Sequence, residues 1–412
     1  MHFTENKYSE NNKRFIVLAN GVINAAGHHL NNNLGLKYAF DSLGMETVFL
    51  AHRRADESVC QLLQAAPVMS YSPYERASKD PLCGDLESCY VAGNTLCEDL
   101  LKSVGKVNAN DVLVITTTTQ NELFACMRLL ELLSLSDRPR LFLNFTLENF
   151  LSKETGEPSP LSSLYRFAAR QIAKNSGPQR TLFSANSSAM VAVLQRIIGF
   201  PVRLLPIPKS YPSELYAEPA AVCNALPCVG VLGDMSAYKG FDLLPELIRL
   251  SPGVRWLIQE PRDGCEKYWG ANSPFVRNNP GVTILKNGMP PDEYYRQFSR
   301  TDIILTPYDK HYKRLQTSGI FAEAVASGKV VIAPSTPWVL EHQQRDAWSG
   351  ETFSEQTADD VSAALKRALA RLPTLKENAR KLAPDWRQSQ SAKKHICDML
   401  NYFAFYANGV TP

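Results

Sequence analysis

Short apolar runs alternate with longer helical stretches along most of this chain, and the alternation starts a second time after a proline-rich interruption. Residues 14–19 (RFIVLA) and 111–115 (DVLVI) are near-continuous apolar runs of strand length. Such runs are typical of strands buried on both faces, as in a parallel sheet covered by helices. The pattern therefore predicts an α/β fold with parallel sheets.

The first half contains five predicted strands and five predicted helices. We expect strands at 14–19, 47–51, 111–115, 141–145 and 181–184, and helices at 28–43, 85–104, 122–133, 161–173 and 186–198. Gly44 and Gly199 follow two of these helices as expected C-caps, and Asn186 is the expected N-cap of the last one. Residues 56–81 are rich in Ser, Tyr and Pro and are expected to be irregular.

The pattern breaks between residues 205 and 227, where PIPKSYP is proline-rich and the following residues show no period. Beyond it we expect strands at 228–232, 254–259, 302–306 and 329–333, helices at 241–250, 291–298 and 318–327, and a helical tail from residue 358. We therefore predict two doubly wound Rossmann-like domains that face each other across a cleft. Their expected bounds are 1–207 and 228–385, with a linker at 208–227 and a C-terminal helix at 386–412 that could pack back on the first domain.

Composition excludes several classes of protein. With 412 residues the chain suits two domains, and a net charge of +3 without blocks of like charge gives no reason to expect a nucleic-acid partner. Nine scattered cysteines without a Cys-x-x-Cys pair argue against a disulfide framework or a zinc site. The polar N-terminus and the lack of an apolar stretch of roughly 20 residues favour a cytoplasmic protein.

A glycine-bearing loop, GDMSAYKG at 233–240, joins the first strand of the second half to its helix. Gly233 lets backbone N–H groups approach an anion, and Lys239 can supply a positive charge to a phosphate. Strand–glycine–helix turns are common, and a solvated lysine is the alternative interpretation. The loop alone therefore does not identify a site.

A second segment follows the buried strand at 302–306. Ser318 and Gly319 would begin a helix whose first N–H groups form an anion site. Glu323 falls in this helix among small apolar residues, and a buried carboxylate needs a partner or a ligand. A ribose diol is a suitable ligand because both of its hydroxyls can donate to the carboxylate. The alternative places Glu323 on a solvated face.

These two segments, GDMSAYKGFDLLPELI and TPYDKHYKRLQTSGIFAEAVASGKVVIA, resemble the donor-binding half of family 4 retaining glycosyltransferases of the GT-B fold. RFIVLANGVINAAGHHLNNNLGLKYAFDSLGMETVFLA and TLFSANSSAMVAVLQRIIGFPVRLLPIP resemble the opening and the last elements of their first domain. The resemblance covers nearly the whole chain. It implies retaining transfer of a sugar from a nucleoside diphosphate, UDP- or GDP-linked, to a glycan, lipid-linked or protein acceptor, as in bacterial surface-polysaccharide or protein glycosylation.

The resemblance also implies roles for individual residues of the second half. Glu323 would hold the ribose, Lys239 the diphosphate, and the N–H groups of Ser318 and Gly319 the phosphates. Arg314 would be a second cation, because a guanidinium can grip phosphate oxygens in bidentate fashion. The loop LKNGMP, with Gly288 and Met289, would contact the base through its main chain.

In the first half, Gly27 and His28 would lie near the reacting sugar and the acceptor, with a purely structural hydrogen bond as the alternative for His28. The resemblance implies no cofactor and no metal, since two cations and a helix terminus can neutralise the departing diphosphate. The sequence contains no Asp-x-Asp triplet. Because acceptors of the family are often lipid-linked, the resemblance also implies a peripheral contact with the inner face of the membrane, at 53–81 or at Arg166, Arg170 and Lys174. A solvated helix face is the alternative for these cations.

Three positions depart from the family pattern. Asp234 and Ser236 stand where relatives carry a loop arginine, Leu315 stands where the first of two paired acids would be, and Asn144 belongs to a segment that often holds a histidine. A degenerate GT-B protein that binds a nucleotide or a partner without turnover is therefore the alternative function. A sugar-nucleotide epimerase would need acidic and His groups that we cannot place. A dehydrogenase is disfavoured because neither half carries G-x-G-x-x-G after its first strand.

Overall fold

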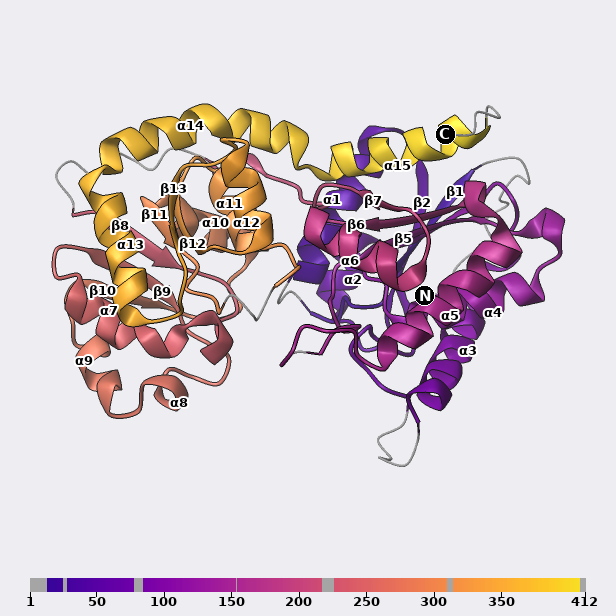
Figure 1. The fold of residues 1–412 in the computed structure, drawn as a ribbon, viewed down its shortest axis with the longest axis horizontal. Coiled ribbons are helices and arrows are strands. Elements are labelled where there is room, and N and C mark those ends of the chain that lie inside the picture. The colour runs from indigo at the N-terminus through magenta and orange to yellow at the C-terminus, as the bar shows by residue number, and fades with distance from the viewer. Residues whose placement is uncertain are drawn as a thin grey trace. The chain divides into compact units, whose positions relative to one another are not determined.

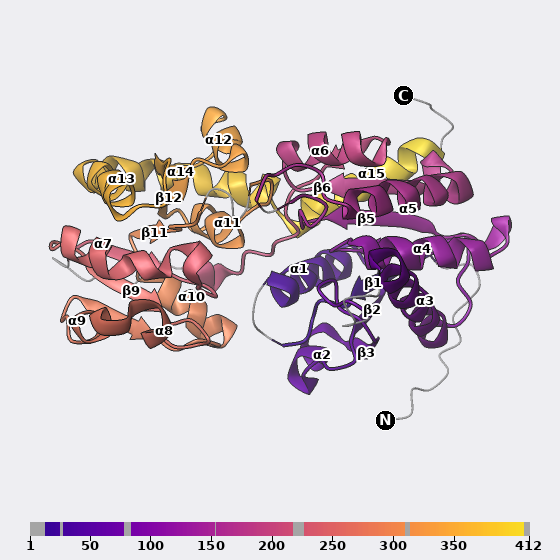
Figure 2. The same cartoon turned by 60° about the horizontal axis from the view of Figure 1, so that its bottom comes forward.

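The computed structural model describes residues 13–24, 28–77, 84–152, 154–216, 226–309 and 314–407. The chain divides into two compact units. The first comprises residues 1–24, 32–208 and 395–412, and the second comprises residues 25–31 and 209–394. Each unit is built on one parallel sheet with helices on both faces (Figures 1 and 2). This arrangement explains why most predicted strands are apolar throughout.

The first unit contains a seven-stranded sheet in the order β3-β2-β1-β4-β5-β6-β7. Its strands are β1 (Arg14–Ala19), β2 (Glu46–His52), β3 (Ala65–Met69), β4 (Val112–Ile115), β5 (Arg140–Phe145), β6 (Thr181–Ala185) and β7 (Val202–Leu204). Its helices are most of α1 (His28–Ser42), α2 (Glu57–Leu63), α3 (Asp85–Val104), α4 (Gln120–Leu132), α5 (Leu161–Ser176), α6 (Ser188–Ile198) and most of α15 (Ala392–Ala407). In the central register, Val17 of β1 lies opposite Phe49 of β2 and Val114 of β4.

The second unit contains a six-stranded sheet in the order β10-β9-β8-β11-β12-β13. Its strands are β8 (Cys228–Val231), β9 (Arg255–Gln259), β10 (Val282–Leu285), β11 (Ile303–Leu305), β12 (Val330–Pro334) and β13 (Gly350–Phe353). Its helices are α7 (Leu244–Leu250), α8 (Glu266–Trp269), α9 (Ser273–Arg277), α10 (Pro291–Ser299), α11 (Gly319–Ala326), α12 (Pro337–Gln344), α13 (Ala358–Ala370) and α14 (Leu372–Ser389). Its core packs around Trp256 and around Phe241, whose ring stacks on Trp269 with centroids 4.7 Å apart.

The α/β class and the doubly wound topology are confirmed, whereas several local expectations are wrong. The segment expected to be irregular, 56–81, contains α2 and the edge strand β3. Asn186 is not the N-cap of α6: that helix is capped by Ser187, whose side chain accepts a hydrogen bond from Met190 N. The amide of Asn186 is buried and instead donates to the carbonyls of Leu205 and Pro206, both at 3.1 Å.

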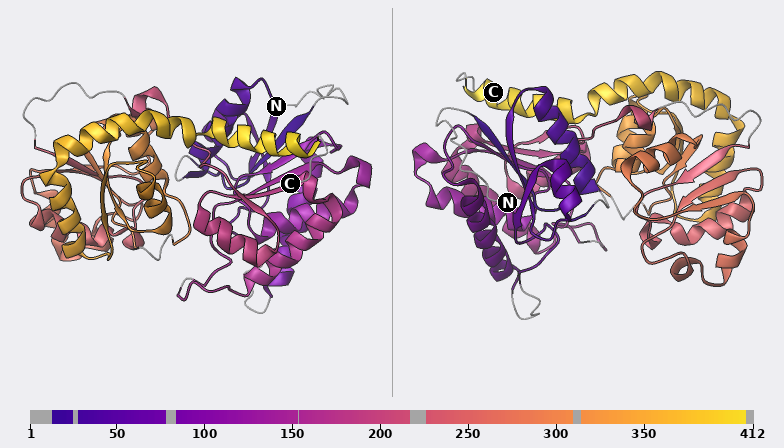
Figure 3. Two further views of the ribbon diagram at one scale, coloured as in Figure 1. Left: turned by 45° about the horizontal axis from the view of Figure 1, so that its top comes forward. Right: turned by 180° about the vertical axis from the view of Figure 1, so that it is seen from behind.

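Most of the C-terminal helix α15 belongs to the first unit (Figure 3). Polar and aromatic side-chain contacts hold it there. His395 lies edge-on to Phe142 with ring centroids 5.3 Å apart, and its Nδ1 lies 2.7 Å from the carbonyl oxygen of Pro206. Further along the helix, Tyr402 donates to the carbonyl of Thr181 at 3.0 Å. Burial lowers the pKa of His395 to about 4, so this imidazole is neutral in the folded protein at neutral pH.

We therefore predict that acid destabilises the fold through His395. In the unfolded chain a histidine takes up a proton near pH 6.5, whereas the buried ring does so only near pH 4. The contribution of His395 to the free energy of unfolding is thus fully present above pH 6.5. It falls between pH 6.5 and 4, by up to about 3 kcal/mol. The thermal midpoint of His395→Gln, followed from pH 7.5 to 5, should fall less steeply than that of the wild type. Equal slopes would contradict the prediction.

Candidate functional site

The sheet of the second unit reverses its winding between β8 and β11, which are neighbours in the centre of the sheet. At such a switch point the loops after the two strands diverge, and ligands bind outside the carboxyl ends of the strands. Here the described parts of these loops are residues 232–240, 306–309 and 314–318. They contain Gly233, Lys239, Arg314 and Ser318 from the residues singled out in the sequence.

The loop after β8 lies against the first turn of α11. Gly233 has φ +103, a conformation that favours glycine, and a Cβ at this position would lie 3.1 Å from Ile320 Cδ1. Its N–H donates to Gln259 Oε1 at 2.7 Å. Main-chain conformation and close packing both select glycine at 233, and they place this loop beside the start of α11.

Lys239 is directed back onto its own loop. Its Nζ donates to the carbonyl of Asp234 and lies 5.9 Å from the centroid of the Tyr308 ring, which follows β11. Burial lowers the pKa of Lys239, nearby Arg262 lowers it further, and Asp234 opposes both. Lys239 thus lies between the two switch-point loops, and its expected contact with a diphosphate stays a prediction.

Arg262 adds a second cation that sequence reasoning missed. It follows β9, and its Nη2 lies 3.2 Å from Asp234 Oδ2. Both side chains are about half exposed, so the pair contributes little to stability. The guanidinium nevertheless reaches the loop in which the family's arginine is missing. The only sequence signal was its position after a predicted strand.

Helix α11 begins with unpaired N–H groups. Ser318 is its N-cap, with Oγ accepting from Phe321 N at 3.3 Å, and Ala322 N donates to the carbonyl of Ser318 at 3.0 Å. Within the described ranges, the N–H groups of Gly319 and Ile320 have no acceptor. Outward N–H groups at the positive end of a helix dipole suit an oxyanion. Binding of an anion at this terminus stays a prediction.

Glu323 lies one turn further along α11 and is only 3% exposed. Its Oε2 accepts a hydrogen bond from Tyr294 OH of α10 at 2.9 Å, and its Oε1 is paired with Lys209 Nζ. Burial, and then the charge of Glu323, raise the pKa of Tyr294, so the phenol is a neutral donor. The alternative of a solvated Glu323 is wrong because these two donors compensate the buried charge. Its role toward ribose stays a prediction.

Sequence reasoning missed both partners of Glu323. Lys209 lies in PIPKSYP, which was assigned to a linker, and its side chain is only 4% exposed. Tyr294 was treated as an ordinary residue of a predicted helix. Nothing in the local pattern links either residue to Glu323, because all three meet only in the tertiary structure.

The structure locates some of the other expected site residues, whereas others lie partly or wholly outside the described residues. Arg314 is partly buried and follows β11. Gly288 is exposed with φ +72 and, with Met289, lies in the loop after β10. His28 begins α1, but its side chain, like all of Gly27, lies outside the described part of the structure. Leu315 is buried at the position of the absent acid.

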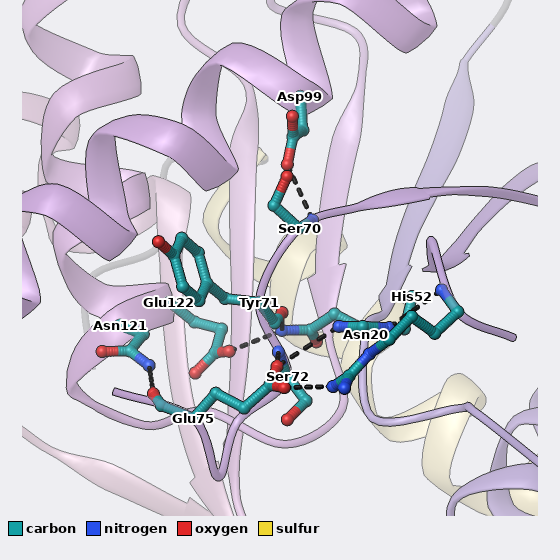
Figure 4. A network of polar contacts seen from close by, with 10 residues as sticks. Asn20, His52, Ser70, Tyr71, Ser72, Glu75, Asp99, Asn121 and Glu122 are labelled. Atoms are coloured by element: carbon teal, nitrogen blue, oxygen red, sulfur yellow. Dashed lines mark hydrogen bonds and ion pairs between the residues drawn. The ribbon is translucent and has the colours of Figure 1, made fainter. Parts of the chain in front are cut away.

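The carboxyl edge of the first sheet carries a second polar network (Figure 4). Asn20, directly after β1, donates to the carbonyl of Tyr71 at 3.0 Å and to Glu122 Oε1 at 2.7 Å. Glu122 Oε2 accepts from Thr119 N at 2.8 Å, which completes the capping box of α4. Burial raises the pKa of Glu122, against the hydrogen bonds of Thr119 and Asn20. This network joins the ends of β1, β3 and β4.

Glu75 extends the same network toward β2. Its Oε2 lies 3.2 Å from His52 Nε2 and accepts from Ser72 N at 2.7 Å, and its carbonyl accepts from Asn121 Nδ2 at 2.9 Å (Figure 4). Each of these groups has a protein partner. The network therefore fixes the chain segment after β3 and gives no sign of an unsatisfied ligand site.

Solved structures share this architecture. Sucrose-phosphate synthase from Thermosynechococcus elongatus superposes with a TM-score of 0.66 and 13% identity, covering 97% of this chain and 100% of that one. A glycosyltransferase from Rickettsia africae superposes with a TM-score of 0.64 and 13% identity, and the match covers 97% of this chain and 100% of that one. HepE of Anabaena in complex with UDP superposes with a TM-score of 0.64 and 14% identity, and the match covers 94% of this chain and 99% of that one. The chain has the GT-B fold.

The expectation drawn from the sequence is therefore confirmed for the fold. No protein-family model and no curated protein sequence matches the chain. No helix in the described ranges is long and apolar enough to cross a membrane. Nor do the described residues contain a group of three or more His, Cys, Asp or Glu side chains that could hold a metal ion.

We predict that Lys209→Met destabilises the protein by about 3–5 kcal/mol, because it leaves a buried carboxylate without its cation. Adding Glu323→Gln removes the lone charge and should restore much of the loss. Lys376→Met is a matched control, since its partner Asp302 forms a more exposed pair whose loss costs about 1 kcal/mol or less. Urea denaturation measures all three variants. Equal losses for Lys209→Met and Lys376→Met would contradict the prediction.

Proposed function

We propose that this chain is a retaining glycosyltransferase that moves a sugar from a nucleoside diphosphate, UDP- or GDP-linked, to a glycan, lipid-linked or protein acceptor. One observation carries the proposal: the N–H groups of Gly319 and Ile320, which have no acceptor among the described residues, lie one turn from the buried carboxylate of Glu323. Phosphates need N–H donors and a ribose diol needs an acceptor. A nucleoside diphosphate carries both groups next to each other.

Neighbours in the fold support the choice of donor. Structures of HepE from Anabaena contain UDP, UDP with glucose, and UDP-glucose, at TM-scores of 0.62–0.64 and 13–14% identity. The catalytic domain of starch synthase IV from Arabidopsis thaliana is bound to ADP and acarbose, with a TM-score of 0.61. Four structures with the same architecture thus hold a nucleoside diphosphate or its sugar conjugate.

In the proposed complex each group of the donor has a partner in the second unit. The phosphates accept from the first turn of α11, the ribose donates to Glu323, and the main chain of Gly288 and Met289 contacts the base. Lys239 and Arg314 balance the charge of the diphosphate. These cations lie in the two loops that follow β8 and β11.

The proposed reaction breaks the bond between the anomeric carbon and the diphosphate, and forms a bond from that carbon to the acceptor oxygen on the same face. The acceptor proton passes to the departing phosphate oxygen. Negative charge grows on the diphosphate as the bond breaks, and Lys239, Arg314 and the N-terminus of α11 stabilise it there. Gly27 and His28 would lie on the acceptor side, and this reaction needs no metal.

A second candidate function is binding of a nucleotide or partner without turnover. Two observations favour it: Leu315 buries an apolar side chain where the family carries an acid, and the loop after β8 lacks the family's arginine. Slow hydrolysis of one nucleotide-sugar would favour the enzyme. Tight donor binding with neither hydrolysis nor transfer would favour the degenerate protein.

We predict that one nucleoside diphosphate among UDP, GDP, ADP and dTDP stabilises the wild type against heat. At about 100 times its dissociation constant the gain is roughly 2.7 kcal/mol, or several degrees. The gain should shrink for the 2′-deoxy form of that nucleotide and for Glu323→Gln, since both remove a partner from the ribose contact. Glu377→Gln, an exposed control, should behave as the wild type. If no nucleoside diphosphate raises the thermal midpoint of the wild type, the candidate that binds a partner without turnover is favoured instead.

We further predict that Lys239→Ala lowers kcat more than it lowers donor affinity, because its charge is needed most in the transition state. Steady-state turnover and equilibrium binding of the donor, measured on the same preparation, give the two effects. Lys267→Ala removes an exposed lysine of the same unit and should change neither. Equal losses in turnover and affinity would argue against the transition-state role.

A further inference from the structure

The main chain of Lys209 is held firmly where the first unit passes into the second. Its carbonyl accepts a hydrogen bond from Ala392 N at 2.8 Å. Two residues later, Tyr211 OH donates to the carbonyl of Gln390 at 2.8 Å. The base of the lysine side chain is therefore fixed against the segment between α14 and α15.

The ammonium of Lys209 has more donors than partners. A lysine carries three N–H donors. One of them is taken by Glu323 Oε1, and the described residues offer no acceptor for the other two. The side chain is only 4% exposed, so bulk water does not readily satisfy them. Unsatisfied buried donors are costly, which points to a group outside the chain that accepts from them.

The ammonium of Lys209 lies beside the N-terminus of α11 as well as beside Glu323. A Cβ at Gly319 would lie 3.1 Å from Lys209 Nζ and 3.2 Å from its Cε, so the cation touches the first residue of α11. Helix N-termini carry partial positive charge and favour anions over cations. Three features therefore concentrate positive charge at one point: the ammonium and the free N–H groups of Gly319 and Ile320. The single negative charge of Glu323 is shared with Tyr294.

We propose that Lys209 binds the diphosphate of the donor, and this inference rests on the proposed function. The two spare N–H groups of the ammonium donate to phosphate oxygens that the first turn of α11 also holds. Lys209 thereby supplies from the interdomain connection a charge that Asp234 and Ser236 cannot supply from the loop after β8. Because it contacts Glu323 as well, it links the phosphate site to the ribose site.

A purely structural role for Lys209 would have a different signature. A lysine that only orients Glu323 affects the ribose contact, which a nucleoside and its diphosphate share. A lysine that contacts phosphate affects only the ligands that carry phosphate. The ratio of nucleoside to nucleoside diphosphate affinity therefore separates the two roles.

The test is calorimetric titration of UDP and uridine, and of GDP and guanosine, into Glu323→Gln and into the double variant Lys209→Met/Glu323→Gln. The Glu323→Gln background leaves no lone buried carboxylate when the lysine is removed, and circular dichroism checks that both variants are folded. Removing Lys209 should weaken binding of the diphosphate about 10- to 100-fold, as expected for a charge-assisted hydrogen bond. The nucleoside affinity should change less than about threefold.

Lys329→Met is the matched control, because Lys329 Nζ donates to the carbonyls of Ser299 and Thr301 at 2.7 and 2.8 Å and not toward α11. It should leave the ratio unchanged. Equal loss for nucleoside and diphosphate, or no loss for either, would overturn the role of Lys209 while the wild type still binds nucleotide. Failure of the wild type to bind UDP or GDP would instead refute the proposed function itself.

Discussion

A buried carboxylate needs partners for its charge, and the second unit contains one such carboxylate, that of Glu323. Glu323 is held in the small-residue helix α11 and needs a donor for each of its oxygens. Tyr294 of α10 supplies one, and Lys209 of the interdomain connection supplies the other. This requirement brings three separate segments of the chain to the carboxyl ends of β8 and β11. The same arrangement leaves the first turn of α11 with positive potential and unpaired donors, which is the physical reason to expect an anionic ligand there.

The two units share a doubly wound topology but differ in the hydrogen bonding of the polar groups at the carboxyl ends of their strands. In each, the loops after the two central strands diverge at a switch point, and polar residues collect at the carboxyl edge. In the first unit, Asn20, Glu75 and Glu122 have protein partners that bind the loops to one another. In the second unit, donors near Gly319 have none among the described residues. Among the described residues, these unpaired donors at the start of α11 locate the candidate ligand site of the second unit.

Much of this could be predicted from the sequence, because strands buried on both faces are apolar throughout. The central strands were located to within a residue or two, and α11 begins where Ser318 and Gly319 were expected to start a helix. Three edge strands were missed: β3 contains Pro67, and β10 and β13 are mostly half-buried and include polar residues, so none reads as a continuous apolar run. Lys209, Tyr294 and Arg262 could not be found, because their importance comes from contacts between segments far apart in the chain.

The most direct test of the account is a crystal structure grown with UDP or GDP. The account predicts the diphosphate on the N–H groups of Gly319 and Ile320, and the ribose hydroxyls on Glu323. A nucleotide bound elsewhere, or a Glu323 that keeps both its present partners while nucleotide binds away from α11, would contradict it.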